Sequence, residues 1–188
     1  THDIQLMINL FRKVKKNTFR SISIPKFDKS IDDRCKKNSW FKLKKKPDIL
    51  ILEGWCVGAK PENSKSLNKP INVLEKNTDK KKIWRSYVNN QLKLKYSKLF
   101  DQLDSLLYLK AKNFKLLKRW RLKQEKKLKM KSGTKKNSKI MNEEEVETFM
   151  MTYQRITQNM FKNTPKYSSA VIDLNENHQI KRVRLKHA

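Results

Sequence analysis

Long apolar runs, cysteine pairs and glycine are scarce in this sequence of 188 residues. No stretch approaches the roughly 18 consecutive apolar residues that a membrane-spanning helix needs. The two cysteines, Cys35 and Cys56, lie far apart and outside any CxxC pattern, which argues against a disulfide framework or a structural zinc site. We therefore expect a cytoplasmic protein that folds as one domain over residues 1–188 and has no membrane segment.

Three glycines, Gly54, Gly58 and Gly133, are too few for a glycine-rich nucleotide-binding loop. A phosphate loop has the pattern G-x-x-x-x-G-K-[ST], in which backbone N–H groups surround the phosphates. Gly133-Thr134-Lys135 has no glycine five positions before it and no strand ahead of it. The sequence therefore contains no phosphate loop.

Positive charge is abundant: 46 basic residues stand against 18 acidic ones, a net charge of +28. Lysine contributes 37 of the basic residues and arginine nine, and Asn (16) and Ile (13) are also frequent, a joint excess typical of an A/T-rich genome. Arginine, the better bidentate ligand of phosphate and guanine, is not enriched. We therefore expect only non-specific binding of nucleic acid, through counterion release.

The hydrophobic pattern predicts alternating strands and helices. Helices are expected over residues 4–15, 83–101, 114–130 and 142–161, the last with a capping box of Asn142 and Glu145. Strands are expected over 20–24, 48–52, 105–109, 170–174 and 180–185. Surface loops are expected over 28–47 and 57–80, and a flexible linker over 131–140. This order predicts an α/β fold with a mostly parallel sheet.

The run Asp48-Ile-Leu-Ile-Leu52 has no polar interruption, as is typical of a strand buried on both faces. Glu53 and Gly54 follow it. A carboxylate at the end of such a strand lies where open α/β sheets bind ligands, and could hold the water shell of Mg²⁺. The alternative is a strand that ends in a solvated glutamate.

A second candidate is Ile24-Pro-Lys-Phe-Asp-Lys-Ser30, which follows an expected strand. Lys26 and Lys29 could bind a small anion while Asp28 accepts a hydrogen bond from a hydroxyl group. The alternative is an ordinary charged loop. His2 and Asp3 precede the first helix in a similar way, and the alternative role of Asp3 is to cap that helix.

Arg119 and Arg121 form a third candidate, because two of the nine arginines lie on one expected helix, in Arg119-Trp-Arg-Leu-Lys-Gln-Glu125. Arginines of this kind neutralise charge on a transferred phosphoryl group. The alternative is a solvated helix face on which Trp120 packs inward and Arg121 pairs with Glu125.

Several stretches, in order along nearly the whole chain, resemble the bacterial glycerate-kinase-type branch of the P-loop kinases, relatives of uridine kinase and pantothenate kinase. The stretches are Thr1-His-Asp3, Ile24 to Ser30, Ile51-Leu-Glu-Gly-Trp-Cys-Val-Gly-Ala-Lys-Pro61, Trp84-Arg-Ser-Tyr-Val-Asn89, Arg119 to Glu125, Met141-Asn-Glu-Glu-Glu-Val146 and Phe149 to Tyr153. The Glu-Gly-Trp and Arg-Trp-Arg-Leu blocks are specific when they occur together.

The resemblance implies ATP and Mg²⁺ as cofactors and a small hydroxy acid, D-glycerate, as substrate. Glu53 is similar to the acid at the end of the Walker B strand, and Arg119 and Arg121 fall in the lid over the ATP phosphates. The other implied site residues belong to acceptor-binding segments: His2, Asp3, Lys26, Asp28 and Lys29.

Family members begin earlier, with a strand, the Walker A loop and a further catalytic carboxylate, which do not precede Thr1 here. The chain therefore resembles the larger C-terminal portion of such a kinase, and we expect it to be inactive alone. Two alternatives stay open: a basic protein that binds nucleic acid or an acidic partner, and a non-catalytic kinase remnant.

Overall fold

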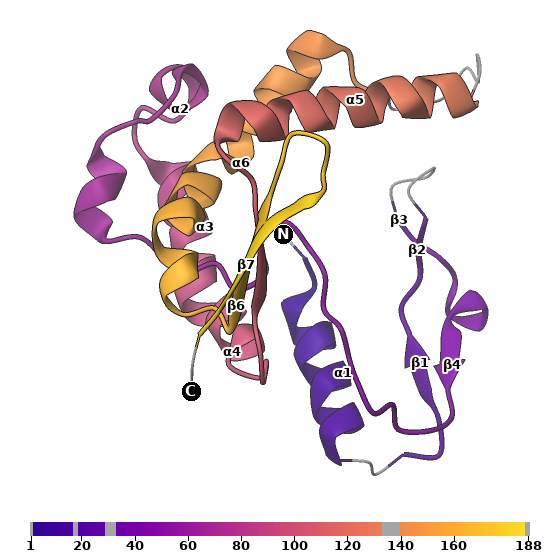
Figure 1. The fold of residues 1–188 in the computed structure, drawn as a ribbon. Coiled ribbons are helices and arrows are strands. Elements are labelled where there is room, and N and C mark those ends of the chain that lie inside the picture. The colour runs from indigo at the N-terminus through magenta and orange to yellow at the C-terminus, as the bar shows by residue number, and fades with distance from the viewer. Residues whose placement is uncertain (1, 17–18, 29–32, 133–139, 187–188) are drawn as a thin grey trace. The chain divides into compact units, whose positions relative to one another are not determined.

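A computed structural model describes residues 2–16, 19–28, 33–132 and 140–186 (Figure 1). The chain divides into two compact units, Thr1–Gly54 and Trp55–Ala188. The expected single domain stays a prediction. No helix in these described ranges is long and apolar enough to cross a membrane.

The first unit consists of one helix and short antiparallel strands. Its elements are α1 (Ile4–Lys16), β1 (Ile22–Ile24), β2 (Phe27–Asp28), β3 (Asp33–Arg34), the 3₁₀ turn Lys37–Ser39 and β4 (Phe41–Leu43). The helix predicted over residues 4–15 is confirmed, and its buried side chains are Ile4, Ile8, Phe11 and Val14. Strand β1 ends before Pro25, which has no N–H to donate to a ladder.

The surface loop expected over residues 28–47 is wrong in part. Strand β4 pairs with β1 in antiparallel register, with Ile22 opposite Leu43, and β2 pairs with β3. These strands are two or three residues long, too short for an alternating pattern to show in the sequence.

The buried strand expected over residues 48–52 is also wrong. The run has no regular secondary structure, and Ile49 and Ile51 are 78% and 82% exposed. A strand buried on both faces needs neighbours that hydrogen-bond to it, and none of the ladders among the described residues includes this run. Glu53 consequently lies in irregular, exposed chain and not at the end of a strand.

The second unit combines helices with a three-stranded sheet (Figure 1). Its strands are β5 (Leu107–Lys110), β6 (Ala170–Leu174) and β7 (Ile180–Leu185), in the order β5-β6-β7. Strand β6 runs parallel to β5 and antiparallel to β7. The α/β class is confirmed for this unit, but a mostly parallel sheet is wrong for the described residues, because β5 and β6 are their one parallel pair.

The long helices of this unit match the predicted ranges, but the surface loop expected over residues 57–80 is wrong in part, because it contains α2 and a 3₁₀ turn. They are α2 (Val73–Thr78), α3 (Ile83–Gln91), the π-helical turn Leu92–Tyr96, α4 (Ser97–Phe100), α5 (Phe114–Ser132) and α6 (Glu143–Asn163), with 3₁₀ turns at Ser64–Asn68 and Thr164–Lys166. The capping box of α6 is confirmed: Asn142 accepts from the N–H of Glu145 at 2.9 Å, and Glu145 accepts from the N–H of Asn142 at 2.8 Å. Most of the expected linker lies outside the described residues.

The core of the second unit forms where Ala59, Leu92 and Met160 pack together. Tyr108 of β5 lies against this cluster, whereas Leu107 and Leu109 on the opposite face are exposed. In the sheet register, Leu107 shares that face with Leu185, and Leu109 shares it with Val183, both also exposed. Strand β5 is therefore partly buried on one face and exposed on the other.

Candidate functional site

A cavity of about 360 Å³ lies along α5, and we call it the α5 cavity. Its lining is cationic and aromatic, with one amide and no carboxylate: Trp55, Leu117, Trp120, Arg121, Lys123, Gln124, Lys127 and His178. Such a lining suits an anion, because several positive charges converge on one concave space.

Three side chains contact the guanidinium group of Arg121. Its Nη2 lies 2.5 Å from a carboxylate oxygen of Glu125, and its Nη1 donates to Gln124 at 2.8 Å. The group also lies 5.1 Å from the centre of the Phe149 ring. Its Nε is buried and has no hydrogen-bond partner within the described residues. Among the described residues, Nε of Arg184 is buried and unpaired in the same way, so this feature does not by itself indicate a ligand.

The turn between β6 and β7 forms one wall of the α5 cavity, where Figure 1 shows it reaching α5. Trp120 stacks on His178 at 4.2 Å, and its Nε1 donates to the backbone carbonyl of Glu176 at 2.9 Å. Arg119 turns toward the same segment and pairs with the Glu176 carboxylate at 2.6 Å. This hydrogen bond lowers the pKa of Glu176. The two predicted lid arginines therefore lie in different surroundings: Arg121 lines the cavity and Arg119 does not.

Trp55 completes the cavity lining from the start of the second unit. Its indole Nε1 donates to Thr157 Oγ1 at 3.0 Å, and its ring stacks on Tyr153 at 5.6 Å. Trp55 stood in the Glu-Gly-Trp motif, but His178 was not among the predicted site residues. A histidine in an Asn-rich turn gives no local signal, since it reaches the cavity only through the docking of the turn on α5.

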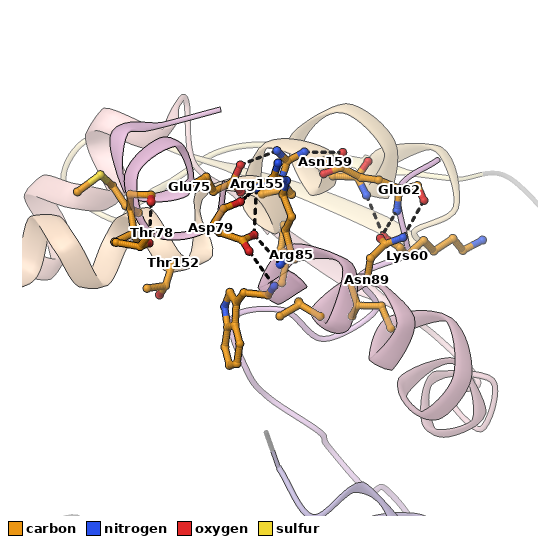
Figure 2. A pocket seen from close by; sticks show the side chains of 16 residues that line it. Lys60, Glu62, Glu75, Thr78, Asp79, Arg85, Asn89, Thr152, Arg155 and Asn159 are labelled. Carbon is orange, nitrogen blue, oxygen red and sulfur yellow. Dashed lines mark hydrogen bonds and ion pairs between the residues drawn. The ribbon is translucent and has the colours of Figure 1, made fainter. Parts of the chain in front are cut away.

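A second cavity, of about 300 Å³, lies among α2, α3 and α6, and we call it the ion-pair cavity (Figure 2). Arg155 of α6 binds both carboxylate oxygens of Glu75, at 2.7 and 2.6 Å, and one oxygen of Glu62 at 3.2 Å. It also donates to the carbonyls of Ser66 and Lys69. One arginine thus joins α6 to three separate parts of the chain between residues 62 and 75.

Arg85 and Asp79 form the second half of this network (Figure 2). The Asp79 carboxylate accepts from the backbone N–H groups of Trp84 and Arg85, at 2.9 and 3.0 Å, and so caps the first turn of α3. Arg85 is buried and donates to the Asp79 carboxylate at 3.0 Å and to the carbonyl of Leu67 at 2.7 Å. Five of the six charged groups that line this cavity therefore have partners among themselves, and the network is a structural connection between α3, α6 and the chain around them.

Acid is expected to destabilise the second unit through this network. Burial alone would raise the pKa of Asp79 and Glu75, but hydrogen bonds and charge from Arg85 and Arg155 outweigh it, so both pKa values lie below their ordinary 3.8 and 4.5. A lowered folded-state pKa adds stability above the unfolded value, and this is lost as pH falls through the folded value.

Urea unfolding should therefore show constant stability from pH 7 to about pH 5 and a decline below about pH 4.5. In the variant Asp79→Asn, the free energy of unfolding should fall less steeply in that acidic range. An identical acid profile for the variant and the wild type would contradict a contribution from Asp79.

In the first unit, the predicted acceptor-site residue Asp3 has structural partners. Asp3 accepts from the N–H of Leu6 at 3.1 Å, which caps α1, and pairs with Arg34 of β3 at 3.1 Å. Arg34 thereby joins Asp3 to the β2–β3 hairpin that carries Asp28. The sequence motifs did not indicate Arg34, because this residue lies after the candidate segment Ile24 to Ser30.

The remaining predicted residues of this unit are less defined. His2 and Lys26 are exposed, and Lys29 lies outside the described residues. Within the parts of the chain that the structure describes, no three His, Cys, Asp or Glu side chains are grouped to hold a metal ion. Exposed Glu53 fits Mg²⁺ only as a single carboxylate acting through water.

No protein-family model matches the sequence. The chain is 33% identical over 159 residues to the uncharacterized kinase mug58 of Schizosaccharomyces pombe, an alignment that covers 81% of this chain and 54% of that protein. The chain thus spans about half the length of this relative. Its organism is a fungus, so it does not support the bacterial branch named in the sequence resemblance.

Two solved structures share the fold. D-glycerate 3-kinase from Cryptococcus neoformans var. grubii aligns with a TM-score of 0.78 and 22% identity, covering 99% of this chain and 67% of that one. The YGR205w protein aligns with a TM-score of 0.68 and 25% identity, covering 98% and 64%. The chain therefore has the α/β fold of these structures and a sequence similar to that of a protein named as a kinase.

Proposed function

We propose that this chain is the larger part of an ATP-dependent small-metabolite kinase that phosphorylates D-glycerate. The observation that carries the proposal is the cationic α5 cavity, which Arg121, Lys123 and Lys127 line. The fold shared with a D-glycerate 3-kinase and the identity with an uncharacterized kinase support it.

In this proposal the γ-phosphoryl group of ATP passes to a hydroxyl oxygen of the acceptor, ADP leaves, and the hydroxyl proton goes to a carboxylate. Arg121 binds the polyphosphate in the α5 cavity and neutralises charge that develops on the transferred group. Arg119, which pairs with Glu176, would contribute after releasing that carboxylate.

The acceptor would be bound by the first unit. His2, Lys26 and Lys29 supply positive or hydrogen-bonding groups for its carboxylate, and Asp3 or Asp28 orients its hydroxyl group. Mg²⁺, when bound, neutralises phosphate charge. Glu53 would hold its water shell.

The test adds a phosphate loop to this chain. A chimera that carries the phosphate-loop segment of a P-loop kinase ahead of Thr1 should release ADP when given Mg-ATP and D-glycerate. Glycerol, which has the hydroxyl groups but lacks the carboxylate, is the matched control and should be a poor substrate. A soluble, folded chimera without ADP release above background would overturn the proposal.

The chain without that segment should bind Mg-ATP weakly or not at all, because a phosphate loop supplies most backbone contacts to the phosphates. Isothermal titration calorimetry measures this directly. Micromolar binding would mean that another segment replaces the loop.

A further inference from the structure

Glu125 is a buried acid on a cationic helix. It is the one acidic residue in the α5 sequence, and it is only 4% exposed although lysines surround it at positions 123, 126 and 127. Burial of a carboxylate costs free energy unless it is paired and hydrogen-bonded. We therefore expect the Glu125 carboxylate to have a partner that stabilises it.

Each carboxylate oxygen of Glu125 has its own partner. One oxygen lies 2.5 Å from Nη2 of Arg121, one helical turn earlier, and the other accepts from the backbone N–H of Met141 at 3.1 Å. Met141 immediately precedes Asn142, which caps α6. Glu125 thus connects the cavity arginine to the first turn of the next helix.

These contacts restrict the guanidinium group to one orientation. Its two terminal nitrogens interact with the Glu125 carboxylate and the Gln124 side-chain oxygen, and the Phe149 ring of α6 lies beside the group. The remaining nitrogen, Nε, is buried and has no partner among the described residues. An arginine fixed in advance loses less conformational freedom when it meets its ligand.

We propose that Glu125 is a positioning residue, which holds Arg121 in the α5 cavity in the orientation required for phosphoryl transfer. The inference rests on the proposed kinase function and deepens it, since Glu125 itself faces Arg121 and Met141 and does not line the cavity. A purely structural role, as a tie between α5 and α6, is the competing explanation.

Glu125→Gln separates the two explanations, because glutamine keeps the size and one acceptor oxygen but loses the charge. In the chimera, this variant should lower kcat about tenfold and leave KM for D-glycerate unchanged. In a background of Arg121→Ala the same change should have almost no further effect on kcat, because the group that Glu125 orients is gone. Glu147→Gln, which alters an exposed carboxylate paired with Lys118, is the matched control and should be silent.

A stability cycle on the 188-residue chain gives a readout independent of catalysis. Urea unfolding of the wild type, Arg121→Ala, Glu125→Gln and the double variant should show non-additive losses, because the two side chains interact directly. An equal loss of kcat from Glu125→Gln with and without Arg121 would overturn the positioning role, and additive stability losses would overturn the pairing. Failure of the proposed function appears differently, as a chimera inactive even with the wild-type residues.

Discussion

Replacing Arg121 with alanine in the phosphate-loop chimera is expected to lower kcat by about 10³-fold, with KM for ATP changed only a few-fold. The reason is that charge on the transferred group develops in the transition state, so losing the arginine is not a uniform loss of binding. Arginines in this role are worth on the order of 10³ or more in rate. Steady-state kinetics with Mg-ATP and D-glycerate measure both constants.

Lys126→Ala is the matched control for this variant. Lys126 is a cation on the same helix, exposed and absent from the cavity lining, whereas Lys127 lines the cavity and is therefore unsuitable. A solvated lysine contributes little to local energetics. If both variants retain the same kcat, Arg121 is only part of a charged helix surface.

The largest effect on stability is expected from Arg155→Ala. Its side chain is 10% exposed and binds two carboxylates and two backbone carbonyls, so its removal leaves the partly buried carboxylates of Glu62 and Glu75 without this partner. Breaking a buried ion pair from one side costs about 3–5 kcal/mol. We expect a loss of this size in the free energy of unfolding, measured with urea at pH 7.

Lys118→Ala provides the comparison, because Lys118 pairs with Glu147 at 2.8 Å on the exposed side of the helices. Exposed pairs contribute about 0–1 kcal/mol, so this variant should unfold close to the wild-type midpoint. Equal losses for Lys118→Ala and Arg155→Ala would show that the ion-pair cavity adds no particular stability.

The long helices could be predicted because their patterns extend over many residues. Helices α1, α5 and α6 begin and end within about two residues of the expected bounds, and β6 and β7 coincide with theirs. The run 48–52 shows the limit of such patterns. Its apolar residues favour a strand, but a strand also requires neighbouring strands to pair with. The five residues of the run do not indicate whether such neighbours are present.

The site shows the same limit. The motif placed Arg119 and Arg121 on one helix, which is correct, and assigned both to one role. Residues two apart on an α-helix point about 200° away from each other, so one arginine faces the α5 cavity and the other faces Glu176. His178 and the Trp120 stack depend on a contact across 58 positions, which helical spacing cannot indicate.

The exposed apolar face of the β5–β6–β7 sheet has a consequence for the behaviour of the chain in solution. Leu107, Leu109, Val183 and Leu185 are exposed apolar side chains on one face, on either side of Ala170 and Ile172 of β6, and exposed apolar side chains gathered on one face promote self-association. The net charge of +28 opposes this, because like-charged molecules repel one another. Salt screens that repulsion while leaving hydrophobic attraction in place. Colloidal stability should therefore be highest at low ionic strength, where the lysine-rich surface keeps these faces apart.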